Sequence, residues 1–334
     1  MNRNTLNIVG SHYTGRDLCQ TGLFVSANDQ QEITGNDDTT EPLISDADLA
    51  IGVRDNQFVM HYQPKIDTRT LEFVSVEALI RWIHPVLGMV MPDSFIPLAE
   101  QGQHIHGITD IVLKTALKQS AQWRELGLDL RMSINISGAS LEVPDLPERI
   151  HDVTNAFNVP ADKIVLEVTE TWQSKDTDTA LDILNGLSAK GFGLALDDVG
   201  TGHSNFSKLQ GMPYSEMKLD KSHIQSATID QETRQFIAMC VELGHEMGMY
   251  VVAEGIESQD QWEMMSAMGC DEAQGFFIAR PMPGDQIPGW LKRWNRYLGL
   301  AENHQRASGQ KVNLDEMTGT FHRLNSIFPT KLDI

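Results

Sequence analysis

The chain has 334 residues, of which 41% are hydrophobic, so it can bury a sizeable core in one large domain with accessory segments. Its 46 acidic side chains outnumber the 26 lysines and arginines, and the net charge of -20 argues against long-range attraction to DNA, RNA or an anionic membrane. The three cysteines lack zinc-type or CxxC spacing. With no signal-peptide pattern and no apolar stretch of roughly 18 residues, a cytoplasmic protein without a membrane span is predicted.

The first 45 residues are rich in acidic and small polar side chains and contain few large apolar ones. Such a segment cannot offset its ordering entropy by burial, so residues 1–45 are predicted to be a disordered polar leader. The regular hydrophobic pattern begins with ISDADLAIGVRD, which predicts a short helix with Ser45 or Asp46 as its N-cap.

Two strand-like runs follow, FVMHYQPKI and LEFVSVEALIRW, and only the turn-like DTRT joins them. So short a link permits only an antiparallel pair, because a parallel crossover needs a dozen or more residues. Further strand-like runs then alternate with helical stretches near 106–126, 146–157, 176–190, 231–247, 259–268 and 285–298. This order predicts an α/β fold, a (β/α)8 TIM-like barrel over residues 46–298 with an antiparallel first strand. An open doubly wound sheet is the alternative.

Residues 299–334 are predicted to form a C-terminal tail with one amphipathic helix. Apolar side chains in NLDEMTGTFHRLNSIF fall three or four positions apart, at Leu314, Met317, Phe321, Leu324 and Phe328. This spacing indicates one apolar helical stripe, and Asn313 with Glu316 resembles a capping box at its start. The stripe would dock on the barrel or on a second subunit.

Acidic and amide side chains stand at the downstream ends of successive strand-like runs. In a barrel these strand ends meet at one mouth, so the side chains are expected to converge there. A buried carboxylate is costly unless it is paired or metal-bound, and several converging carboxylates therefore indicate a cation cluster. The series consists of Glu77, Asn135, Glu167, Glu170, Asp197, Asp198, Glu254 and Gln274.

The donor types of this series favour Mg²⁺ or Mn²⁺ over zinc, because they are oxygens without any cysteine. Adjacent residues of a strand point to opposite faces, but the turn-forming GTG after Asp197 and Asp198 would let both face one site. One carboxylate could then bridge two cations while its neighbour binds the second. Each acid taken alone could equally be a helix cap or a member of an ion pair. The metal site is favoured because several such acids occur together at successive strand ends.

Two basic residues accompany the series. Lys218, in SEMKLD, would face the same mouth and orient a nucleophile or neutralise a phosphate, with a structural ion pair as the alternative. Arg81 suits bidentate phosphate binding, with a surface pair as the alternative. The glycine-rich segment DDVGTGHSNFSKLQGMP favours a mobile loop, and it lacks the GKS or GKT ending of a P-loop.

Taken together, these motifs resemble the EAL-domain cyclic di-GMP phosphodiesterases over about residues 48–296. The matching stretches are YQPKID, VEALIRW, HPVLGMVMPDSFIPLAE, INIS, LEVTE, LALDDVGTG, MKLD, VVAEGIE and QGFFIARPMP. The resemblance implies hydrolysis of cyclic di-GMP to linear pGpG with two divalent cations, Mg²⁺ or Mn²⁺, in a homodimer. The alternatives are a non-catalytic cyclic di-GMP receptor that signals through a partner protein, and a structural scaffold.

The resemblance also implies a role for each matching position. The metal ligands would be Glu77, Asn135, Glu167 and Asp197 for the first cation, and Asp198 and Glu254, with Asp197 bridging, for the second. The catalytic residues would be Glu77, Lys218, Glu254 and Asp198, of which Lys218 contacts the nucleophilic water. The substrate-binding residues would be Gln63, Arg81 and Gln274, and the loop-supporting residues would be Glu170 and Glu257.

The loop after the two aspartates departs from the family pattern DDFGTGYSSL at Val199 and His203. Losing two aromatic side chains is expected to loosen the loop or to change its coupling to a dimer partner, and it removes no ligand. The polar leader is too short to form a regulatory domain, so the regulatory input is expected to be missing, to come from a separate protein, or to come from the tail.

Overall fold

The computed structural model describes residues 44–102, 104–169, 177–201 and 211–308. The predicted leader up to residue 43, the amphipathic stripe of the tail, Glu170 and His203 lie outside the described residues, so those expectations stay predictions. In the part of the chain that is described, the helix after the leader is α1 (Asp46–Arg54). Its N-cap is Ser45, one of the two residues that the sequence predicted, and Ser45 also forms a capping box with Asp48.

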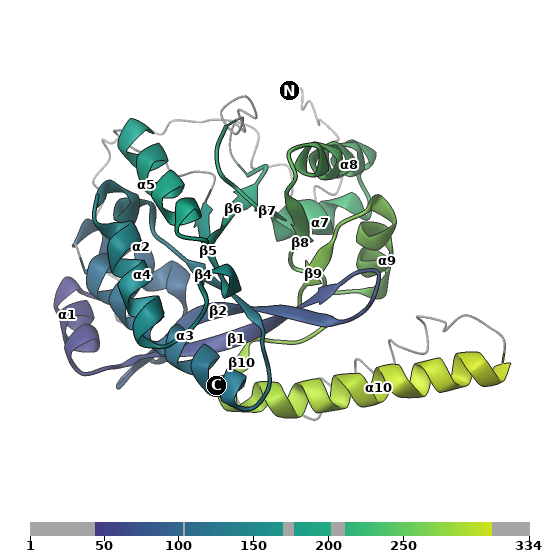
Figure 1. Cartoon of the computed structure of the whole chain (residues 1–334), viewed down its shortest axis with the longest axis horizontal. Helices are drawn as coiled ribbons and strands as arrows, with labels where there is room; N and C mark the ends of the chain where they lie inside the picture. Colours follow the sequence, from purple (N-terminus) through teal and green to yellow (C-terminus); the bar gives the residue numbers. More distant parts are fainter. Residues whose placement is uncertain (1–43, 103, 170–176, 202–210, 309–334) are drawn as a thin grey trace, which may run out of the picture. The chain divides into compact units, whose positions relative to one another are not determined.

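Among the described residues, eight strands close into a barrel, which begins with the predicted hairpin (Figure 1). β1 (Phe58–Asp67) pairs antiparallel with β2 (Phe73–His84) on one side and with β9 (Glu272–Gln274) on the other, which closes the ring. From β2 onward all neighbouring barrel strands are parallel. They are β4 (Arg131–Asn135), β5 (Ile164–Thr169), β6 (Gly193–Val199), β7 (Glu216–Leu219) and β8 (Tyr250–Ala253). The barrel with an antiparallel first strand is confirmed, and the open sheet is excluded.

The helices lie outside the ring of strands (Figure 1). Those that the hydrophobic pattern predicted are α3 (Ile105–Glu125), α4 (Leu146–Ala156), α5 (Thr177–Ala189), α8 (Gln231–Glu246), α9 (Gln259–Met268) and α10 (Ile287–Ser308). The pattern did not predict α2 (Pro92–Gln101), α7 (Lys221–Ala227), β3 (Gly88–Val90) or β10 (Met282–Pro283). In α2 an internal proline, Pro97, interrupts the helical signal, although Pro92 and Asp93 are typical of a helix start.

The last helix crosses the boundary expected between barrel and tail. α10 continues to Ser308, past its predicted end near residue 298, because the polar stretch AENHQRAS contains mostly good helix formers. Its first half is anchored on the barrel, where the rings of Trp290 and Trp294 stack with centroids 5.3 Å apart and Trp294 Nε1 donates to the Leu71 carbonyl (2.9 Å). The division into a barrel domain (46–298) and a tail (299–334) stays a prediction. The boundary between the two lies within α10.

Side-chain alternation separates an apolar outer layer from a charged interior. On β5, Ile164, Leu166 and Val168 pack in the hydrophobic core, whereas Glu167 is buried on the opposite, inner face. β7 follows the same rule, since Met217 belongs to the core while its neighbours turn inward. The barrel interior thus collects ionisable groups instead of the apolar layers that usually fill such barrels.

No helix of the described residues is both long enough and apolar enough to cross a bilayer.

One glycine allows two strand ends to approach closely. Gly275 follows β9, and a Cβ atom there would lie 2.1 Å from the Ile256 carbonyl oxygen and 2.2 Å from its nitrogen. Because backbone atoms cannot move aside as a flexible side chain does, Gly275→Ala is expected to lower the free energy of unfolding by about 3 kcal/mol or more. Chemical denaturation measures this. Gly289→Ala is the matched control, since its Cβ would meet only Arg293 Nη1 at 3.6 Å; equal stability of both variants would contradict the close approach.

Candidate active site

The ammonium of Lys218 lies at the centre of the acidic series. Its Nζ is 2.7 Å from Glu167 Oε2, 2.7 Å from Glu254 Oε1, 3.0 Å from Asp197 Oδ1 and 3.8 Å from Glu77 Oε1. These carboxylates stand on or directly after β2, β5, β6 and β8, so four separate strands bring them to one place. The structure therefore joins the side chains that the strand ends predicted to converge.

Two amide side chains bond the carboxylate of Glu77, and a third bonds one of those amides. Asn135 Nδ2 donates to Glu77 Oε1 (2.8 Å), and Gln274 Nε2 donates to Glu77 Oε2 (2.6 Å) and to Gln63 Oε1 (2.9 Å). Gln63 in turn donates from Nε2 to the Ala279 carbonyl (2.9 Å). Both oxygens of Glu77 thus accept a hydrogen bond from an amide. Gln63 does not contact Glu77 and acts on it only through Gln274.

A break in β6 turns both adjacent aspartates toward the site. Asp198 has a φ of +58°, a left-handed conformation that non-glycine residues rarely adopt, and the pairing of β6 with β7 shifts register after Leu196. Asp197, Asp198 and Glu254 consequently offer oxygens within 4.8 Å of one another, an acidic cluster that could hold a cation. The prediction that both aspartates face one site holds, but the turn lies at Asp198 itself, before the glycines that were expected to make it.

Burial and mutual repulsion oppose ionisation of several of these acids. Burial raises the pKa of Glu77 and of Asp197, and it raises that of Glu254 well above the usual value. Burial also raises the pKa of Asp198 to about 6, with further contributions from Asp197 and Asp220. The aspartate at 220, which sequence reasoning did not single out, caps α7. Burial, with added repulsion from neighbouring carboxylates, thus makes the ionised form of these acids less favourable than it is in water.

Glu167 and Lys218 behave differently because opposite charges outweigh burial. Burial alone would favour a protonated Glu167, but Lys218 and Lys65 hold its pKa at about 2. Burial likewise opposes the charge on Lys218, yet the surrounding carboxylates raise its pKa well above normal. The site is thus built around one ionised glutamate and one permanent ammonium.

Of the remaining predicted residues, Arg81 is buried near the site. Its Nη1 donates to the Ile80 carbonyl (2.8 Å), and burial lowers its pKa while Glu77 and Asp93 favour its charged form. Burial excludes the alternative of a surface pair. Glu257 is exposed, and the loop that it was predicted to support lies mostly outside the described residues. Its supporting role, like that of Glu170, stays a prediction.

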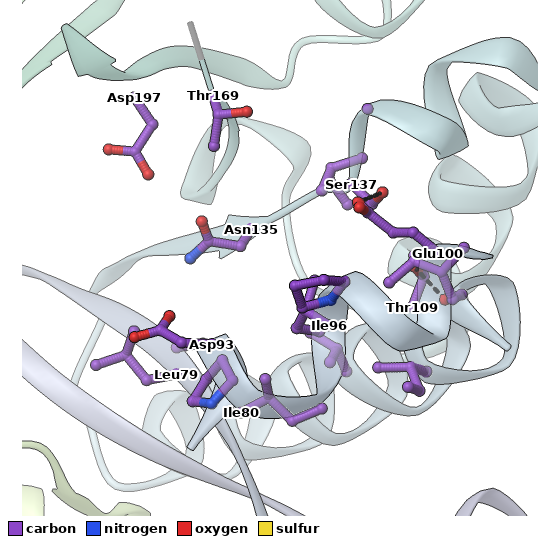
Figure 2. Close-up of a pocket in the computed structure, with 18 of the residues that line it drawn as sticks. Leu79, Ile80, Asp93, Ile96, Glu100, Thr109, Asn135, Ser137, Thr169 and Asp197 are labelled. Carbon is purple, nitrogen blue, oxygen red and sulfur yellow. Dashed lines mark hydrogen bonds between the residues drawn. The ribbon is translucent and has the colours of Figure 1, made fainter. Parts of the chain in front are cut away.

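A pocket of about 410 Å³ opens beside the carboxylates. Glu77, Asn135, Asp197 and Asp198 line one end of it, and isoleucines of α2 and α3 line much of the rest together with polar side chains such as Glu100. Figure 2 shows Asp197 and Asn135 at one end of this space and Ile96 and Thr109 toward the other. Its size and its apolar wall with a few convergent polar groups are typical of a small-molecule site.

The EAL-domain family model matches residues 46–281 of the chain. A cyclic di-GMP phosphodiesterase of Pseudomonas aeruginosa is 36% identical over 251 residues, which cover 75% of this chain and 43% of that protein. The cyclic di-GMP phosphodiesterase PdeR of Escherichia coli is 32% identical over 254 residues, which cover 76% and 38% of the two chains. The chain thus spans less than half the length of these curated relatives.

Solved structures agree with the sequence comparison. The PaMucR phosphodiesterase in its c-di-GMP complex superposes with a TM-score of 0.69 at 35% identity, covering 72% of this chain and 98% of that one. An EAL-domain protein from Listeria monocytogenes has a TM-score of 0.65 at 27% identity, covering 73% and 96%. With the family match over most of the barrel, the chain belongs to the EAL-domain family.

Proposed function

We propose that the protein is a phosphodiesterase that hydrolyses cyclic di-GMP to linear pGpG with two divalent cations, Mg²⁺ or Mn²⁺. The observation that carries the proposal is the meeting of carboxylates from separate strands beside a pocket of ligand size. Relatives named cyclic di-GMP phosphodiesterases, at 36% and 32% identity, support the substrate class.

The chemistry of the donors fits two hard cations. Glu77, Asn135, Glu167 and Asp197 would hold the first, and Asp197, Asp198 and Glu254 the second. Burial disfavours the ionised form of Glu77, Asp197 and Glu254 and raises their pKa values, and a bound divalent cation would offset this cost by pairing with the carboxylates. When bound, such cations activate a water molecule near neutral pH and offset charge on the phosphoryl oxygens.

The chain's own groups orient the reactants. Lys218 keeps its proton because four carboxylates surround it, so its ammonium donates hydrogen bonds to the attacking water and offsets negative charge on the phosphate. The amides around Glu77 prevent that carboxylate from rotating. Arg81 adds positive charge near the phosphate, and the apolar part of the pocket excludes water from the bound nucleotide.

Incubation of the purified protein with cyclic di-GMP and Mn²⁺ or Mg²⁺, followed by chromatography, tests the proposal. We expect pGpG to accumulate and EDTA to abolish both turnover and much of the binding. Without cations the carboxylates repel the substrate, and two unit charges about 5 Å apart interact by roughly 3 kcal/mol at an effective dielectric constant of 20. Tight binding of intact dinucleotide without cleavage would indicate a receptor, and calorimetry that detects neither metal nor nucleotide would indicate a scaffold.

We also propose that the enzyme works as a homodimer and receives its regulatory input from a separate protein. Specific activity that rises with protein concentration, in parallel with the dimer fraction measured by sedimentation, would support dimerisation. A specific activity independent of concentration across the range where the mass changes would contradict it.

A further inference from the structure

A second lysine lies inside the barrel, one layer further from the mouth than Lys218. Lys65 of β1 is fully buried. Its Nζ donates to Ser133 Oγ (2.7 Å), Glu167 Oε1 (3.1 Å) and Glu216 Oε1 (2.9 Å). Glu216 precedes Lys218 by two positions on β7, so both side chains face the interior at successive levels.

The carboxylate of Glu167 is held between the two ammonium groups. Lys65 binds its Oε1 and Lys218 its Oε2, at 3.1 and 2.7 Å, and Ser133 adds a side-chain hydrogen bond. Donors on both oxygens fix the rotation of the carboxylate plane. Groups that hold a metal-ligating side chain in this way typically affect metal affinity or activity by about 10- to 100-fold when they are removed.

A purely structural role would make Lys65 the counterion of Glu216. Glu216 has a second cation nearby, however, because Arg131 Nη1 lies 3.9 Å from its Oε2 and also bonds Glu272. The shared contact with Glu167 is therefore the part of the Lys65 network that bears on the mouth of the barrel.

We infer that Lys65 is a positioning residue, whose ammonium holds Glu167 Oε1 so that Oε2 faces the cation site beside Lys218. The inference rests on the proposed function, because it treats Glu167 as a metal ligand. Lys65 itself lies behind that carboxylate and would touch neither the cations nor the substrate.

Charge-balanced variants separate positioning from structural support. Lys65→Met alone leaves Glu216 facing an apolar side chain, and the protein can lose stability for that reason. The double variant Lys65→Met/Glu216→Gln removes one charge of each sign and keeps the buried cluster neutralised to the same degree. Glu216→Gln alone is the matched control, since it keeps the contact between Lys65 and Glu167.

The readouts are the Mn²⁺ affinity measured by calorimetry without substrate, and kcat and KM for cyclic di-GMP. We expect the control to stay within about threefold of the wild type. In the double variant, Mn²⁺ affinity and kcat should each fall about tenfold or more, with a smaller change in KM. Ser133→Ala, which removes the hydrogen bonds of Ser133 to Lys65 and to Glu167 without removing a charge, should weaken Mn²⁺ binding several-fold even if the double variant does not fold.

An Mn²⁺ affinity of the double variant equal to that of Glu216→Gln would overturn the inference, and so would an unchanged affinity in Ser133→Ala. If one of these outcomes is found while the wild type binds Mn²⁺ and cleaves the dinucleotide, the proposed function stands and only the role given to Lys65 is wrong. A wild type that binds no Mn²⁺ would overturn the proposed function, and the role of Lys65 with it.

Discussion

Replacing Lys218 by methionine is expected to destabilise the metal-free protein by roughly 3–5 kcal/mol and to abolish turnover. Its ammonium is the shared partner of four buried carboxylates, and removing one member of a buried set of ion pairs leaves uncompensated charge. Methionine keeps the length of the side chain, so the effect reports on the charge. Chemical denaturation in EDTA and a turnover assay with Mn²⁺ measure the two effects.

The matched control is Lys190→Met, at a lysine whose Nζ lies 3.1 Å from Glu148 on the surface. Exposed pairs of this kind contribute at most about 1 kcal/mol. Mn²⁺ should restore part of the stability lost in Lys218→Met, because divalent cations would then offset the same carboxylates. If Lys218→Met is as stable as the wild type in EDTA, the carboxylates do not need this ammonium as a counterion. That result would contradict the arrangement of charges described for the site.

The variant Asp197→Asn is expected to lower turnover by more than about a hundredfold while leaving the metal-free fold at least as stable as the wild type. Burial and the charge of Glu167 raise the pKa of Asp197, whereas Lys218 lowers it. The raising effects are larger, so the pKa lies above its usual value. A carboxylate whose pKa is higher in the folded than in the unfolded state costs stability once the pH exceeds the unfolded value, and stability returns as the pH falls through the folded value. Asparagine removes this cost at neutral pH.

Three measurements check the second variant: turnover with Mn²⁺, the melting temperature in EDTA, and the rise of that temperature on adding Mn²⁺. The rise should be smaller in Asp197→Asn than in the wild type, because a ligand is lost. Asp182→Asn, at an exposed position of α5, is the control and should match the wild type in all three. Near-normal turnover in folded Asp197→Asn would contradict the metal assignment, and a lower melting temperature in EDTA would contradict the electrostatic argument.

Local signals accounted for most of the fold. The four-residue link DTRT forced an antiparallel hairpin, and the alternation of strand-like runs with helical stretches gave the remaining order of the barrel. The elements that escaped prediction are short or interrupted, such as β3, β10 and the proline-containing α2. Toward the C-terminal end of the barrel domain, the polar composition after residue 298 did not mark the end of the helix, because α10 continues to Ser308 through residues that mostly favour helices.

The sequence predicted most residues of the site, but it predicted fewer of the contacts between them. Strand ends of a barrel meet at one mouth, which is why Glu77, Glu167 and Asp197 could be grouped from their places in the sequence. The same reasoning did not find the left-handed turn at Asp198, because it depends on how β6 leaves its pairing with β7. It also missed Lys65, which looked like an ordinary polar residue of a hairpin.

The sequence by itself determined which oxygen donors stand at strand ends, because strand periodicity and link length are local properties of the chain. Only the tertiary structure decided which atoms meet, such as Lys65 and Lys218 on the two oxygens of Glu167. Contacts between β1, β5 and β7 depend on how the barrel closes and how its strands are staggered, and no local pattern encodes those distances.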